Sequence, residues 1–213
     1  MERSNTPECL DDPNLPAALR ADVHQSLTKI HNFLGNTATI VAALRRDPRP
    51  VRRVLDVGCG CGGMLPALHR GTGAEVLGID LQPAGSVSPH PILRADALSD
   101  RLPESDVAIA VCLIHHLTES EFALLVANVR RSCRRFLILD LVRHRLPLAL
   151  FRFGVAPWVH PITAADGIRS IRRAYTPAEL RRLVSASLRD TAARFRQTVS
   201  PFYIRQVIDI TFE

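Results

Sequence analysis

One ten-residue segment constrains this chain more than any other: V-L-D-V-G-C-G-C-G-G, residues 54 to 63. Its apolar beginning is typical of a buried strand, and its glycines are typical of a sharp turn. The spacing of the apolar residues that follow is typical of a helix. Gly58 and Gly60 lack a Cβ, so a ligand can lie against their backbone, and the helix beyond them offers free N–H groups. The segment therefore predicts a strand, turn and helix that hold an anionic or carboxylate-bearing cofactor.

Strand-like and helix-like segments alternate after this point. Strands are predicted at residues 53 to 57, 75 to 80, 92 to 95, 106 to 113 and 136 to 141, and several of them are nearly continuous apolar runs that suit a parallel sheet covered on both faces. Two helices precede these strands, and helices are expected between them, with capping signals at Thr118 and Thr176. The second signal predicts a helix from 177 to about 189.

The end of the chain changes character. Residues 192 to 198 and 204 to 211 are predicted to be two strands joined by a short connection, and hence an antiparallel hairpin. The predicted fold class is therefore α/β, a Rossmann-like, doubly wound sheet of seven strands, mostly parallel with an antiparallel C-terminal hairpin.

With 213 residues, of which 46% are hydrophobic, the chain is expected to form one domain. Within it we expect an N-terminal helical cap over residues 1–50, a cofactor-binding core over 51–141, a substrate lid over 142–175, and the final helix and hairpin over 176–213. Residues 1 to 14 are polar and rich in proline, which predicts a loose leader.

The charge and the cysteines narrow the class of partner. The net charge of +6 comes from scattered arginines, since Lys29 is the one lysine. A nucleic-acid partner is not expected, because the sequence has no basic run interleaved with aromatic residues. The five cysteines form no C-x-x-C pair, which favours a reduced, cytoplasmic protein. The chain's beginning lacks a signal-peptide pattern and no apolar stretch is long enough to span a bilayer, so neither secretion nor a membrane span is expected. The expected partner is a small molecule, and the oligomeric state is left open.

The glycines alone leave the cofactor undecided, because Gly58, Gly60 and Gly63 also satisfy the dinucleotide pattern G-x-G-x-x-G. Asp56, two residues before the first glycine, could pair with an ammonium group but would repel a pyrophosphate. The chain also has no Tyr-x-x-x-Lys pair and little room for a separate substrate domain. S-adenosylmethionine is therefore favoured, with a nicotinamide-dependent oxidoreductase or a non-catalytic binding protein as alternatives.

Acids at two further strand ends fit the same cofactor. Asp80 follows the loop by about twenty residues, the spacing at which a carboxylate reaches a ribose diol. Asp96, with Ala97, ends the third strand and could accept a hydrogen bond from an adenine amino group, while Leu81 could pack on the same ring.

The motifs V-L-D-V-G-C-G-C-G, G-I-D, R-A-D-A and H-H-L, in this order, resemble the class I S-adenosylmethionine-dependent methyltransferases over roughly residues 50 to 141. The resemblance implies that the first loop carries the methionine part, the acid after the second strand binds ribose, and the third-strand acid binds adenine. The expected cofactor site comprises Asp56, Gly58, Cys59, Gly60, Asp80, Leu81, Asp96, Ala97 and Cys112.

Two later segments, D-L-V-R-H-R-L and D-G-I-R-S-I-R-R-A-Y-T-P-A-E-L, resemble a bacterial methyltransferase-11/25-like subgroup that is thought to methylate phenolic or polyketide-type small molecules of secondary metabolism. The segment from 82 to 91 departs from the family, because it is too short for the helix that usually joins the second and third strands. A loop over the adenosine is expected there instead.

Methyl transfer from a sulfonium requires alignment of the acceptor and, for a hydroxyl, removal of its proton. His115 and His116 follow the fourth strand, whose carboxyl end faces the cofactor in this architecture, and either one is a candidate general base. Proximity alone is the alternative. Cys59 and Cys61 cannot both chelate a metal and cradle a cofactor, so no metal is assigned.

The expected substrate residues come from the segment after the fifth strand. Asp140, Arg143 and His144 leave this strand on the cofactor side and are candidates for orienting the acceptor. Phe151 and Trp158 lie in an apolar stretch, residues 146 to 159, whose composition suits a pocket wall. An aromatic or lipid-like acceptor is the resulting hypothesis.

Overall fold

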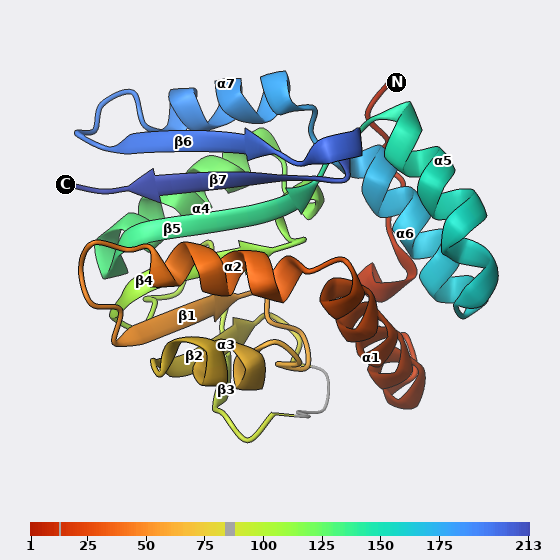
Figure 1. Ribbon diagram of the computed structural model, residues 1–213, viewed down its shortest axis with the longest axis horizontal. Helices are drawn as coiled ribbons and strands as arrows, with labels where there is room; N and C mark the ends of the chain where they lie inside the picture. The colour runs from red at the N-terminus through yellow and green to blue at the C-terminus, as the bar shows by residue number, and fades with distance from the viewer. Residues whose placement is uncertain (13, 84–87) are drawn as a thin grey trace.

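The core of the molecule is one mixed β-sheet (Figure 1). The computed structural model describes residues 1–12, 14–83 and 88–213, and within these the sheet has seven strands in the order β3-β2-β1-β4-β5-β7-β6. The strands are β1 (Arg53–Val57), β2 (Glu75–Asp80), β3 (Ile92–Arg94), β4 (Ser105–Val111), β5 (Cys133–Leu141), β6 (Arg194–Val199) and β7 (Arg205–Thr211). β1 to β5 are parallel, whereas β7 runs antiparallel to β5 and β6, which confirms the predicted fold class.

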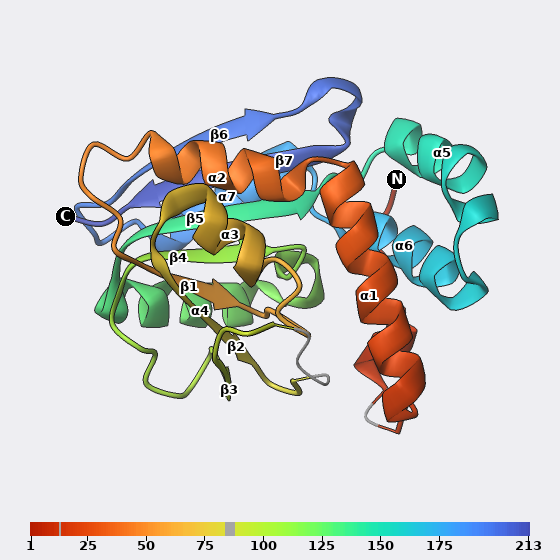
Figure 2. The same ribbon diagram turned by 60° about the horizontal axis from the view of Figure 1, so that its bottom comes forward.

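Helices cover both faces of this sheet. They are α1 (Ala17–Phe33), α2 (Asn36–Arg45), α3 (Leu65–Thr72), α4 (Glu119–Ser132), α5 (Arg145–Gly154), α6 (Pro161–Arg173) and α7 (Pro177–Ser187), with single turns η1 (Cys9–Asp11), η2 (Ile114–His116), η3 (Ala156–Trp158) and η4 (Pro201–Tyr203). Figure 2 shows α2 and α3 on one face and α4 on the other. In the part of the chain that the structure describes, no helix has the length and apolarity needed to span a membrane.

Alternation along the buried strands explains the two layers. In β5, Phe136 and Ile138 pack with α4 and α7, whereas Leu137 and Leu139 pack with α2 and α3. Successive side chains of a strand point to opposite faces, so a strand covered on both sides is apolar throughout. The remaining helices, α1, α5 and α6, gather beyond the ends toward which the β1 and β5 arrows point (Figure 1).

Local signals set several element boundaries. Thr118 and Thr176 cap α4 and α7, each accepting a hydrogen bond from the third residue of its helix, as the sequence predicts. Gly35 adopts a φ of 70°, a left-handed conformation that glycine tolerates, and it separates α1 from α2.

Two expectations are wrong, and one helix was missed. No helix lies between β3 and β4 in the residues described there, because β3 is a three-residue edge strand that a short connection follows. A loop was expected between β2 and β3, over 82–91; its described residues form no helix, and residues 84–87 lie outside the description. The segment expected to be a substrate lid, 142–175, contains α5 and η3 and continues into α6, which was not predicted, and its role as a lid stays a prediction. Residues 1–12, called here the N-terminal segment, are not loose, since Glu8 is only 7% exposed.

Candidate functional site

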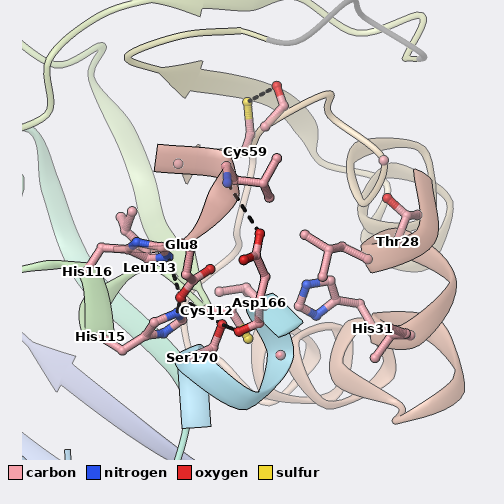
Figure 3. A pocket seen from close by; sticks show the side chains of 18 of the residues that line it. Glu8, Thr28, His31, Cys59, Cys112, Leu113, His115, His116, Asp166 and Ser170 are labelled. Atoms are coloured by element: carbon pink, nitrogen blue, oxygen red, sulfur yellow. Dashed lines mark hydrogen bonds and ion pairs between the residues drawn. The ribbon is translucent and has the colours of Figure 1, made fainter. Parts of the chain in front are cut away.

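A cavity of about 470 Å³ lies beyond the carboxyl ends of β1, β2 and β4. Residues of α1, α6 and the N-terminal segment complete its wall, opposite the strand ends (Figure 3). In open α/β sheets this edge, where neighbouring strands connect in opposite directions, is where ligands bind. Its volume lies within the range of small-molecule sites.

The glycine loop after β1 forms one wall of the cavity. Gly58 has a φ of 72°, a left-handed conformation that favours glycine, and a Cβ on it would lie 2.8 Å from Leu113 Cδ1, so the Leu113 side chain would have to move. The N–H groups of Gly58 and Cys59 donate to the Ile79 carbonyl at 2.9 and 3.1 Å. The N–H of Gly60 donates to Asp80 Oδ2 at 2.8 Å, so β2 holds the loop in place.

Asp56 is the buried acid of this wall. It is 3% exposed at the end of β1 and lines the cavity. Burial, with a smaller contribution from the nearby charge of Asp80, raises the pKa of Asp56 to about 7. A cationic ligand group next to it would favour the carboxylate, so this wall is suited to an ammonium group and unsuited to a phosphate.

The end of β4 carries a strained cysteine. Cys112 has a φ of 54°, which a non-glycine residue rarely adopts, and its N–H donates to the Leu139 carbonyl at 2.8 Å. Burial raises the pKa of the Cys112 thiol, so the side chain is a neutral, uncharged part of the cavity wall. Backbone strain of this kind is often found at functional sites.

His115 lies buried between two carboxylates. Its Nδ1 lies 2.7 Å from Asp140 Oδ1, and its backbone N–H donates to Asp140 Oδ2 at 3.0 Å. Its Nε2 lies 3.4 Å from Glu8 Oε1. Burial opposes a charge on the ring, but Asp140 and Glu8 outweigh it and raise the pKa of His115 to about 10. With that proton in place, His115 is a poor base near neutral pH.

His116 is the more accessible of the two histidines, with 24% of its side chain exposed. Its Nδ1 lies 3.1 Å from Asp11 Oδ1, and its Nε2 lies 3.8 Å from Glu8 Oε1. The two rings are 4.3 Å apart between centroids. Figure 3 shows both rings with Glu8 on one side of the cavity, and His31 on the opposite side, where burial lowers the pKa of His31 to about 4 and keeps it neutral.

α6 anchors the N-terminal segment over the cavity. Asp166, 1% exposed, accepts the N–H groups of Cys9 and Leu10 at 2.8 and 3.3 Å. The Ser170 hydroxyl donates to Glu8 Oε1 at 2.8 Å. The His115 ring 3.4 Å away, the charge of His116 and the Ser170 hydroxyl hold the pKa of Glu8 below its usual value despite its burial. Sequence reasoning missed these residues, although the spacing of Glu8 and Asp11 forms a capping box around η1.

Most of the predicted cofactor residues line the cavity, namely Asp56, Gly58, Cys59, Gly60, Asp80, Leu81 and Cys112. Asp96 and Ala97 are not among the lining residues. The carboxylate of Asp96 instead accepts the Leu98 N–H at 2.9 Å and the Ser99 hydroxyl at 3.0 Å. The adenine role of Asp96 and Ala97 stays a prediction.

Both predicted catalytic histidines line the cavity, and so does Phe151. The other predicted substrate residues have contacts elsewhere. Asp140 holds His115, and the buried Arg143 donates to Glu179 and to the carbonyls of Ala174 and Met1.

The last two predicted substrate residues lie on or next to α5. His144 caps this helix and stacks on Tyr203, with 4.6 Å between ring centroids. Trp158 is 84% exposed. Their substrate roles, like those of Asp140 and Arg143, stay predictions without a contact to the cavity.

Searches with this sequence match no protein-family model and no curated protein. Solved structures share its fold. Human N-acetylserotonin methyltransferase in complex with SAM superposes with a TM-score of 0.67 at 16% identity, over 92% of this chain and 56% of that chain. The plantazolicin methyltransferase BpumL in complex with SAH gives a TM-score of 0.71 at 15% identity, over 95% of this chain and 92% of that chain.

A second plantazolicin methyltransferase, BamL, in complex with a triazolic desmethylPZN analog and SAH, gives a TM-score of 0.72 at 14% identity, over 90% of both chains. This chain therefore spans little more than half of the human enzyme, at 56%, and nearly all of the two plantazolicin methyltransferases, at 92% and 90%. At these identities the comparison establishes the fold: this chain has the Rossmann-like fold found in S-adenosylmethionine-dependent methyltransferases.

Proposed function

We propose that this protein transfers a methyl group from S-adenosylmethionine to a small molecule, and that the acceptor is a hydroxyl of a phenolic or polyketide-like compound. The observation that carries the proposal is the buried Asp56 beside the bare backbone of Gly58 and Gly60. This combination suits the ammonium and carboxylate of a sulfonium amino acid. The fold shared with enzymes solved with SAM or SAH supports the same cofactor.

The cofactor roles follow from the positions around the glycine loop. Asp56 holds the ammonium group, and the loop accommodates the methionine part. Asp80 binds the ribose diol, since each of its oxygens can accept a further hydrogen bond beyond those from Gly60 and Gln82. Leu81, 59% exposed at the cavity, packs on the adenine.

The chemistry is one displacement. The bond between the sulfonium sulfur and the methyl carbon breaks as the acceptor oxygen bonds to that carbon, and S-adenosylhomocysteine leaves. The hydroxyl proton passes to His116, which is more accessible than His115 and also lines the cavity. Holding acceptor and methyl donor in line supplies the rest of the rate.

The acceptor lies against the helical side of the cavity. Its apolar lining there consists of Leu10, Leu27, Ile30, Leu34, Phe151 and Ile171. An apolar wall opposite two histidines suits an aromatic molecule with one reactive hydroxyl. In this proposal residues 1–50 cap the site, 51–141 bind the cofactor, 142–175 cover the acceptor, and 176–213 complete the sheet.

Calorimetry tests the cofactor. S-adenosylhomocysteine should bind and NAD should not, because a pyrophosphate would meet the Asp56 carboxylate. The Asp80→Ala variant should lose most of this affinity, while Asp190→Ala, at an exposed position in the turn between α7 and β6, should retain it. Binding of NAD alone would instead assign the chain to the nicotinamide-dependent oxidoreductases.

A screen of phenolic, amine and carboxylate acceptors, with mass detection of a methyl gain, tests the reaction. A phenol should gain one methyl group in the presence of S-adenosylmethionine. Cofactor binding without turnover on any acceptor would support a non-catalytic binding protein of the same fold.

A further inference from the structure

Glu8, His115 and His116 form a cluster at the acceptor end of the cavity, and one ligand atom from each lies within 4.8 Å of the other two. We propose that this cluster binds a divalent transition-metal ion such as Zn²⁺, with the remaining coordination positions open to the cavity. Neither the glycine loop nor the proposed cofactor acids Asp56 and Asp80 take part, so this site is separate from the one proposed for the cofactor.

The distances suit such an ion. Two ligands held about 2.1 Å from a tetrahedral ion lie about 3.4 Å apart. Glu8 Oε1 is 3.4 Å from His115 Nε2 and 3.8 Å from His116 Nε2. All three ligand atoms lie within 4.8 Å of one another, so binding one ion requires only that the His116 side chain, the most exposed of the three, move closer to the other two.

The surroundings orient both rings for coordination. Each histidine has its Nδ1 next to a carboxylate, Asp140 for His115 at 2.7 Å and Asp11 for His116 at 3.1 Å. A carboxylate at the far nitrogen of a metal-binding histidine fixes the tautomer and directs the other nitrogen to the metal. In this cluster the other nitrogen of each ring faces Glu8.

An unpartnered polar atom points to a missing occupant. His115 Nε2 is buried and has no hydrogen-bond partner among the described residues, since its 3.4 Å contact to Glu8 lacks hydrogen-bond geometry. Buried polar atoms almost always have a partner, and a metal ion would provide one. The third ligand, Glu8, is also held in position, because the Ser170 hydroxyl donates a hydrogen bond to Glu8 Oε1 at 2.8 Å.

The charges around the cluster are mostly negative, which favours binding of a cation. Three carboxylates face it, those of Glu8, Asp11 and Asp140. Among the described residues, Arg173 is the arginine in ion-pair contact with them, 3.9 Å from Glu8 and 2.5 Å from Asp11. The excess negative charge is neutralised either by protons on the histidines or by one divalent ion. Mixed imidazole and carboxylate ligands favour zinc, iron, cobalt or nickel over magnesium.

Such an ion would act on the acceptor. If the proposed methyl transfer is correct, a hydroxyl bound to the metal would have a lower pKa and release its proton to water, so that His116 would act as a ligand rather than as the base. Metal binding itself does not depend on that function and is measured without cofactor or acceptor.

The test uses the full-length protein, stripped with a chelator and titrated with Co²⁺ while visible absorption is recorded, with Zn²⁺ as competitor. We expect one ion per chain and the ligand-field bands of nitrogen and oxygen coordination. Glu8→Gln and His116→Ala should each weaken binding at least about a hundredfold, and Asp11→Asn about tenfold to a hundredfold. The control His160→Ala, at the exposed start of α6, should bind as the parent does.

Three results would overturn the proposal. They are no Co²⁺ uptake at millimolar concentration, equal affinity in the Glu8, His116 and His160 variants, and an intense thiolate charge-transfer band that assigns the ion to a cysteine. Circular dichroism and S-adenosylhomocysteine binding establish that each variant is folded. Absent uptake in a folded protein means that protonated histidines neutralise the cluster.

Discussion

Replacing Asp56 by asparagine should stabilise the cofactor-free protein above neutral pH while weakening its affinity for the cofactor. Asp56 is 3% exposed, and its burial, followed by the charge of Asp80, raises its pKa from 3.8 to about 7. An ionised Asp56 carboxylate therefore destabilises the folded protein, because it is buried there but hydrated by water in the unfolded chain.

The size of the effect follows from the pKa difference. The difference between a pKa of 3.8 and one of about 7 corresponds to about 4 kcal/mol in the free energy of ionisation. Because the pKa is higher in the folded state, the penalty is absent below the unfolded pKa of 3.8, grows between there and about 7, and is complete above it. An amide avoids the charge but leaves polar atoms in a buried site at a cost of about 1–3 kcal/mol. A net gain of about 1–3 kcal/mol remains at about pH 8.

Urea unfolding of the parent and Asp56→Asn, each without cofactor, measures this gain at about pH 5 and about pH 8. The variant should gain more at the higher pH, and calorimetry should show weaker binding of S-adenosylhomocysteine. Asp190→Asn, at an exposed position, serves as the control and should change neither property. A variant that is less stable at both pH values, or that binds the cofactor as tightly as the parent, would refute this account of Asp56.

Three further changes test other parts of the molecule. Gly58→Ala should lower stability by about 1–3 kcal/mol and weaken S-adenosylhomocysteine binding, since its φ is 72° and a Cβ would approach Leu113 to 2.8 Å; Gly154→Ala, with open space around it, is the control in thermal unfolding and calorimetry. Phe122→Ala should cost about 3–5 kcal/mol in urea unfolding, because its side chain is fully buried between α4 and the sheet; a cost below 1 kcal/mol would contradict that packing. Ser170→Ala removes the hydroxyl that donates to Glu8, so amide hydrogen exchange in residues 1–12 should become faster, whereas Ser187→Ala, within α7, should leave that exchange unchanged.

Elements with strong local patterns could be predicted from the sequence. The bounds of β1 and β2 agree with the prediction because each is an apolar run that ends at an acid or a glycine turn. The start of α7 follows from its capping box. α6 was missed because Asp166 and Gly167 lie inside it and are typical of a turn. Gly167 lets the Phe151 ring pack against α6, since a Cβ there would lie 2.3 Å from that ring.

The two halves of the candidate site are encoded differently. The cofactor half is local, because the loop that carries Gly58 and Gly60 lies within a few residues of Asp56, and a pattern of that length is visible in the sequence. In the acceptor half, Glu8 lies next to Ser170, which is 162 residues away in the sequence, and no local sequence pattern predicts the hydrogen bond between them. Polar residues such as these look like a solvated leader until their partners on α6 are known. Sequence patterns can therefore suggest the cofactor, whereas the acceptor, and any metal that holds it, depend on contacts that only the folded chain creates.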